Sequence, residues 1–150
     1  MSVADYSRAY EIAREHGDAL VVFEEWMDEL GDVSRGDLAD WDDDDDRREI
    51  VRAALAWMID HGADDLTWQA FVDHALDIEI TGTFSEGEWS VSDVALLVSY
   101  GGPNVRYRVH GLGTVRVSVA WGSDVSEYVV DSGLADYLND LADDLVAGAR

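Results

Sequence analysis

Hydrophobic and polar residues alternate through the middle of the chain, and this period of two predicts β-strands. The alternation covers residues 76–84, 94–100, 105–109, 115–121 and 125–130. Short turns separate these segments, at 85–88, 101–104, 111–113 and 122–124. Strands joined by short turns form an antiparallel meander. We therefore expect a sheet of four or five strands over residues 78–130, with Val105, Tyr107, Val117, Val119 and Trp121 on its buried face.

The first 77 residues instead repeat their apolar positions at helical spacing. Segments 4–30 and 47–76 each contain a helical pattern, a His-Gly pair and a second helical pattern, so we expect two helical hairpins interrupted at Gly17 and Gly62. Segment 47–61 is apolar on most sides and predicts a central helix, whereas 31–46 predicts a polar loop. After the sheet, Asp131 or Ser132 is expected to cap a closing helix within 131–150.

These patterns together predict an α+β fold. It would have N-terminal helical hairpins, an antiparallel four- or five-stranded meander sheet and a C-terminal helix. A length of 150 residues is typical of one domain. We expect a single domain over 1–150, with a helical acidic part (1–77), a sheet (78–130) and a closing helix (131–150).

Charge is unevenly distributed over these parts. The chain carries 33 acidic residues and 10 arginines, with no lysine, for a net charge of −23. Residues 1–77 hold 22 acids and 6 arginines, whereas residues 78–130 hold 6 acids and 3 arginines. The acidic load therefore lies before and after a nearly balanced sheet.

Two helical segments carry like charges at i, i+3 and i+4 spacing, and an aspartate run lies in the predicted loop. These acids are Glu24, Glu25, Asp28 and Glu29; Asp136, Asp140, Asp143 and Asp144; and Asp42, Asp43, Asp44, Asp45 and Asp46. Each like-charge pair at i, i+4 costs about 0.2–0.5 kcal/mol in an isolated helix. Stripes of like charge without lysine partners are therefore destabilising, and their presence needs an explanation. The aspartate run lacks the glycine and glutamate positions of an EF-hand loop, so we expect no designed calcium site.

Composition excludes several kinds of chemistry. Without cysteine the chain has no disulfide, thiolate zinc site or thiol nucleophile, and without lysine it has no Walker-type P-loop. We find neither a Gly-x-Ser-x-Gly nor a Gly-x-Gly-x-x-Gly motif. We therefore favour a protein that is not an enzyme and that uses no cofactor and no metal.

The basic residues have mainly structural interpretations. His16 and His61 are expected in the last turns of helices, where a cation suits the helix dipole, and His110 has no evident partner. Arg106, Arg108 and Arg116 are expected on one polar sheet face, where we predict cross-strand ion pairs with Asp77 and Glu79.

Residues 76–146, about half of the chain, resemble short proteins of phages and mobile elements that have no assigned activity. The shared features are the segment Leu96–Val105, which includes Gly-Gly-Pro-Asn, then Trp121-Gly122 and Glu127-Tyr128. By composition the whole chain is similar to the DNA-mimic class of anti-restriction and anti-CRISPR proteins. That resemblance implies a role as a DNA mimic, but it does not identify which residues of this chain would carry that role.

Three explanations of the acidic surface remain open. A salt-loving or GC-rich source favours Asp and Arg over Lys. A DNA mimic needs rows of carboxylates, and a carboxylate every three or four residues recurs about every 5–6 Å along a helix. A plain acidic interaction domain uses the same charge without DNA geometry.

We favour the mimic, an inhibitor that binds the basic DNA-binding surface of a host restriction enzyme or CRISPR effector. The acids named above, Asp46 excepted, are its candidate partner-binding residues. The overall field should repel nucleic acid itself, so we expect no direct binding to it. A chain without a basic leader or a run of 18 apolar residues is expected in the cytoplasm rather than in a membrane.

Overall fold

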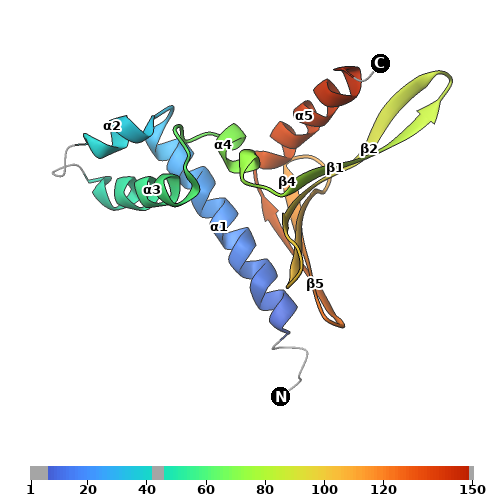
Figure 1. Cartoon of the computed structure of the whole chain (residues 1–150), viewed down its shortest axis with the longest axis horizontal. Helices are drawn as coiled ribbons and strands as arrows, with labels where there is room; N and C mark the ends of the chain where they lie inside the picture. The colour runs from blue at the N-terminus through green and yellow to red at the C-terminus, as the bar shows by residue number, and fades with distance from the viewer. Residues whose placement is uncertain (1–6, 42–45, 149–150) are drawn as a thin grey trace. The chain divides into compact units, whose positions relative to one another are not determined.

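The computed structural model describes residues 7–41 and 46–148, and the chain divides into two compact units. One unit comprises Met1–Ala19 with Ala75–Arg150, and the other comprises Leu20–His74. The elements in chain order are α1 (Arg8–Leu30), α2 (Arg35–Ala39), α3 (Arg48–His61), α4 (Trp68–Asp73), β1 (Asp77–Ser85), β2 (Glu88–Ser99), β3 (Asn104–Val109), β4 (Thr114–Trp121), β5 (Asp124–Asp131) and α5 (Leu134–Gly148). Helices, an antiparallel sheet and a closing helix confirm the predicted α+β class (Figure 1).

The sheet is the meander that the alternating pattern predicts. Its strands follow the order β1-β2-β3-β4-β5, and each neighbouring pair is antiparallel. Between β1 and β2 the turn residues Glu86 and Gly87 have φ values of 55° and 82°. Two successive positive φ values give a tight turn whose twist matches the flanking strands. The strands and turns therefore follow directly from the local sequence.

One face of the sheet forms the core of the first unit. Val105 and Tyr107 of β3 and Val117 and Val119 of β4 are buried, as predicted. Trp121 was expected with them but is 43% exposed, because it is the last residue of β4 and lies beside a turn. Helix α5 packs on β2, β3 and β4. It is capped by Ser132, whose Oγ accepts a hydrogen bond from the Leu134 N–H.

Helix α1 runs without interruption through Gly17, so the predicted break and the first predicted helical hairpin are both wrong. Gly17 is buried, and a Cβ at this position would lie 2.5 Å from the Cδ2 ring carbon of Tyr128 in β5. The absent side chain lets the backbone of α1 approach the sheet closely. This glycine serves helix–sheet packing within the first unit instead of ending a helix.

The second unit is a small helical assembly with an aromatic centre. Phe23 of α1 is buried, with ring centroids of Trp57, Trp68 and Phe71 at 4.7, 5.5 and 4.9 Å. These rings surround one fully buried phenyl group, and aromatic pairs in such geometries add to the stabilisation from burial. Apolar residues from all four helices and their connections complete this core.

Two further expectations for this unit are corrected. The predicted polar loop contains α2, which Ser34 and Asp37 initiate by a reciprocal capping box. Helix α3 buries one stripe, Val51, Ala54 and Met58, while Ile59 is 58% exposed. Its high apolar content therefore does not make it a central helix enclosed on all sides. The predicted end of α3 at Gly62 is confirmed, since this residue has a left-handed conformation.

Candidate functional site

The acidic stripe on α1 lies on the side of the helix opposite its apolar residues. Glu25, Asp28 and Glu29 are exposed, and Glu24 is partly covered. Phe23 and Leu30 on the other side are buried in the second unit. Helical spacing separates the two sets, because residues three and four apart share a face. Within the described part of the chain, none of Glu25, Asp28 and Glu29 forms an ion pair.

The closing helix α5 carries the second stripe. Asp136, Asp140, Asp143 and Asp144 are all exposed, whereas Leu134, Ala135, Leu138 and Ala142 are buried in the first unit. No basic residue lies in the last turn of α5. No ion pair involves these four aspartates within residues 7–41 and 46–148. Both predicted stripes therefore lie at the surface, one on each unit, and apart from the partly covered Glu24 their acids form no ion pair among the described residues.

The remaining predicted partner-binding residues, Asp42, Asp43, Asp44 and Asp45, lie outside the residues that the structure describes. Asp46 follows them, is exposed and precedes α3.

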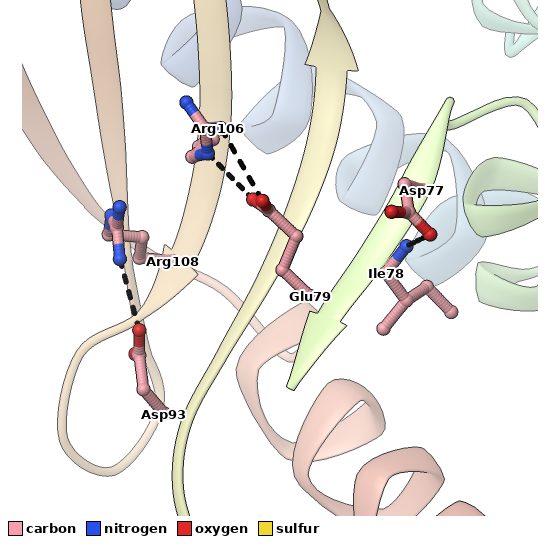
Figure 2. Close-up of polar contacts among 6 residues, drawn as sticks. All are labelled: Asp77, Ile78, Glu79, Asp93, Arg106 and Arg108. Carbon is pink, nitrogen blue, oxygen red and sulfur yellow. Dashed lines mark hydrogen bonds and ion pairs between the residues drawn. The ribbon is translucent and has the colours of Figure 1, made fainter. Parts of the chain in front are cut away.

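Arginines are concentrated on the face of the sheet opposite the core. Arg106 Nε lies 2.6 Å from Glu79 Oε1, and Arg108 Nη1 lies 3.0 Å from Asp93 Oδ2 (Figure 2). On the neighbouring strands, Arg116 Nε lies 3.1 Å from Glu127 Oε2. The predicted use of these arginines in cross-strand ion pairs is confirmed for Glu79.

The expected pairing of Asp77 is wrong. Its Oδ1 accepts a hydrogen bond from the N–H of Ile78, and Figure 2 shows its carboxylate away from both arginines. The alternating pattern did not assign Asp93 and Glu127 to these pairs. They reach their arginines diagonally across neighbouring strands, because Arg108 lies opposite Ala95 of β2 and Arg116 lies opposite Val129 of β5. A sequence pattern does not contain that register.

The register also explains why these pairs are needed. Arg108 and Arg116 lie directly opposite each other across β3 and β4. Like charges at directly opposed positions destabilise a sheet. Asp93 and Glu127 approach the two guanidinium groups from neighbouring strands and offset that repulsion.

The hydrogen bond from Arg106 lowers the pKa of Glu79, and the same bond raises the pKa of Arg106. The Arg106 side chain is 28% exposed and the Glu79 side chain is 40% exposed, so solvent screens the interaction between them. Exposed pairs of this kind contribute about 0.2–1 kcal/mol. The contacts are consistent with a structural role.

A shallow hollow of about 410 Å³ lies among these arginines. Ser118 Oγ is buried at this hollow and has no hydrogen-bond partner within the described residues. The three guanidinium groups that line the hollow are matched by the carboxylates of Glu79, Asp93 and Glu127. Because the charges balance, the hollow offers little net attraction for an anion.

Two histidine expectations are corrected. His16 lies in the middle of α1, where its Nδ1 is 2.6 Å from the Tyr107 hydroxyl. Burial lowers the pKa of His16 and raises the pKa of Tyr107, so the site favours the neutral imidazole, and His16 is not the expected cation at a helix terminus. His110 does have a partner, because Arg116 Nη2 lies 2.9 Å from its Nδ1. His61 lies in the last turn of α3, as predicted.

Comparison of the chain with family models, with curated proteins and with solved structures found no match. Among the described residues, no helix combines the length and the apolar character needed to cross a membrane.

Proposed function

We propose that this protein is an acidic inhibitor that binds the basic DNA-binding surface of a host nucleic-acid-binding defence complex. Restriction enzymes and CRISPR effectors are the target classes we favour. The observation that carries the proposal is that Glu25, Asp28 and Glu29 on α1, and the four aspartates of the α5 stripe, are exposed and form no ion pair within the described residues. Their uncompensated repulsion favours a role in which an external partner supplies the positive charge.

The spacing of the carboxylates supports a DNA-like array. Glu25 and Glu29 are four residues apart on α1, as are Asp136 and Asp140 on α5. At 1.5 Å of rise per residue, such a step is about 6 Å. Duplex DNA carries about one negative charge per 1.7 Å of axis over its two strands. Each stripe taken by itself therefore spaces its carboxylates within about a factor of two of the charges along one DNA strand.

The arginine pairing favours the same interpretation. Arg106 and Arg108 donate hydrogen bonds to carboxylates of the same sheet, and Arg116 lies within ion-pair distance of Glu127, which leaves no excess positive charge among these arginines. A net charge of −23 repels nucleic acid and attracts basic protein surfaces. Such attraction speeds association with the basic partner and makes it sensitive to salt.

The decisive experiment removes three negative charges either from the α1 stripe or from other exposed positions of the second unit, and compares the two variants. In one variant Glu25→Gln, Asp28→Asn and Glu29→Gln are combined; in its matched control Asp32→Asn, Asp60→Asn and Asp65→Asn are combined. All six residues are exposed and belong to the second unit. Binding to purified restriction enzymes and CRISPR effectors, in competition with DNA, is measured beside circular dichroism.

We expect the α1 stripe variant to lose affinity by about tenfold or more, or about 1.4 kcal/mol, while the control retains it. A mimic uses specific carboxylates because the basic residues of its target have fixed positions. A third variant with Asp136→Asn, Asp140→Asn and Asp143→Asn should show a different and smaller loss. Equal losses in all three would show that only total charge matters, which supports an acidic interaction domain without DNA geometry. Tight binding of this protein to DNA in a low-salt gel shift would contradict the proposal.

A further inference from the structure

The β1–β2 hairpin extends beyond the rest of the sheet. Strand β3 pairs with β2 only between Ala95 and Ser99, whereas β1 and β2 pair along their whole length to Ser85 and Glu88. Figure 1 shows the hairpin, in yellow-green, projecting past the other strands beside the C-terminal part of α5. In the outer half of the hairpin, β1 and β2 therefore pair only with each other among the described residues.

Large apolar side chains are exposed on this projection. Phe84 and Trp89 lie opposite each other in the register, are 59% and 50% exposed, and have ring centroids 5.3 Å apart. Leu145, near the end of α5, is 49% exposed. Burying such side chains fully is worth about 1.5–3 kcal/mol each relative to exposure. A contiguous exposed group of this kind is typical of an interaction surface.

An apolar groove connects the hairpin to the helix. Ile80, Gly82, Trp89 and Ser90 form one wall, and Leu145 and Val146 of α5 form the other, around a volume of about 220 Å³. Small-molecule pockets usually span about 300–1,000 Å³. The smaller groove suits one large apolar side chain of a binding partner, which is how interface anchors are usually seated.

Every charge in the elements that form this groove is negative. Strands β1 and β2 and helix α5 contain no arginine and no lysine. Exposed Glu86 and Glu88 precede Trp89, and exposed Asp143 and Asp144 precede Leu145. The charges complement a basic partner, whereas a second copy of this chain would bring the same negative rim and be repelled.

We propose that the groove between the β1–β2 hairpin and α5 docks a basic amphipathic helix of a partner protein. One large apolar side chain of that helix is seated between Trp89 and Leu145, and its lysines and arginines face the surrounding carboxylates. The inference rests on the proposed function for the basic character of the partner. It adds an apolar anchor that a mimic acting through charge alone does not need.

The test uses two synthetic peptides of identical basic composition. One places leucines at i, i+3, i+4 and i+7 along a helix, and its isomer scatters the same leucines over all sides. Calorimetric titration of the whole protein should give about tenfold tighter binding of the amphipathic peptide, because only that peptide presents an anchor on one face. Raising the salt concentration should weaken both peptides but preserve their ratio, since apolar burial is not screened.

Variants then locate the anchor. Trp89→Ser and Leu145→Ser should remove the difference between the peptides, while the weaker binding of the scattered isomer persists. Trp121→Ser and Leu112→Ser are the matched controls, because these exposed residues lie outside the β1–β2 hairpin and do not line the groove. The controls should retain the full preference, and circular dichroism confirms that each variant is folded.

The outcomes separate the two proposals. Equal binding of both peptides to the unaltered protein, or an unchanged preference in Trp89→Ser and Leu145→Ser, would overturn the groove and leave the acidic stripes in place. If neither basic peptide bound, the groove proposal would fall, whereas the proposed function would still be decided by the DNA-competition experiment. Preference for the amphipathic peptide, together with unchanged target affinity in the α1 stripe variant, would retain the groove and reject DNA mimicry.

Discussion

At the scale of single residues, the most informative side chain is that of His16, for which the prediction from the sequence was wrong. His16 faces Tyr107 of the sheet, and their hydrogen bond joins α1 to the core face within the first unit. The Tyr107 side chain is buried, so an unpaired hydroxyl there would cost about 1–3 kcal/mol. Partial burial at this position disfavours the charged form of the imidazole and lowers the pKa of His16.

The lowered pKa of His16 predicts a loss of stability in mild acid. The unfolded chain has the ordinary value of 6.5, and the folded value lies below it because burial outweighs the opposing charge of Glu15. As the pH falls through 6.5 towards the folded pKa, protons bind preferentially to the unfolded chain, and the free energy of unfolding decreases. His16→Gln, which does not titrate, should show a smaller decrease between about pH 7.5 and 5.5 in denaturant titrations.

The unaltered protein and the His16→Gln variant share all other titrating groups. The difference between their profiles of unfolding free energy against pH therefore isolates the contribution of His16. Parallel profiles would show that protonation of His16 does not oppose folding.

At the scale of elements, α1 is continuous because tertiary packing outweighs the helix propensity of one residue. Glycine in a helix interior costs about 1 kcal/mol relative to alanine. Gly17 is nevertheless required by its closeness to Tyr128, whose ring carbons would lie 2.5 and 2.9 Å from a Cβ. Helix formation on both sides of Gly17 is sustained by the buried residues Ala13 and Leu20.

Gly17→Ala should therefore destabilise the protein despite the better helix propensity of alanine. Overpacking of a filled interface costs about 1–3 kcal/mol, and this exceeds the propensity gain. Gly36→Ala is the matched control in α2, since the nearest atom to its Cβ, Ser34 Oγ, is 3.8 Å away. Denaturant unfolding should show a loss for Gly17→Ala and no loss for Gly36→Ala. Stabilisation by Gly17→Ala would contradict the close approach.

At the scale of the whole molecule, self-repulsion is the main electrostatic term. A net charge of −23 on 150 residues opposes the compact state, and the paired arginines of the sheet do not offset it. The exposed stripes on α1 and α5 add local like-charge pairs.

We expect thermal stability to rise as salt is added from very low concentration. Screening within a Debye length of about 10 Å at 0.1 M relieves the repulsion between surface carboxylates. Differential scanning calorimetry over a salt series should show the midpoint levelling off near physiological ionic strength. A midpoint that continues to rise to molar salt, with loss of the fold below it, would instead favour a salt-loving source over mimicry.

Much of the fold was predictable because local patterns carry it. Alternating residues require a buried face and an exposed face, and glycine turns allow tight reversals, so the five-stranded meander followed from the sequence. The helical stripes were predictable for the same kind of reason. Residues such as Glu25 and Glu29 share a face of any helix, whatever the helix packs against.

Tertiary structure alone decided the features that depend on distant partners. From the sequence alone, Gly17 indicates the end of a helix, but its contact with Tyr128 explains why the helix continues. Likewise, His16 alone indicates a cation, but in the fold it lies against Tyr107. The pairing of Arg108 with Asp93 depends on strand register, and the groove at Trp89 depends on where α5 ends against the hairpin. The sequence alone determined periodicity and charge, because these belong to neighbouring residues. Close approach, burial and ion pairing belong to residues that only folding brings together.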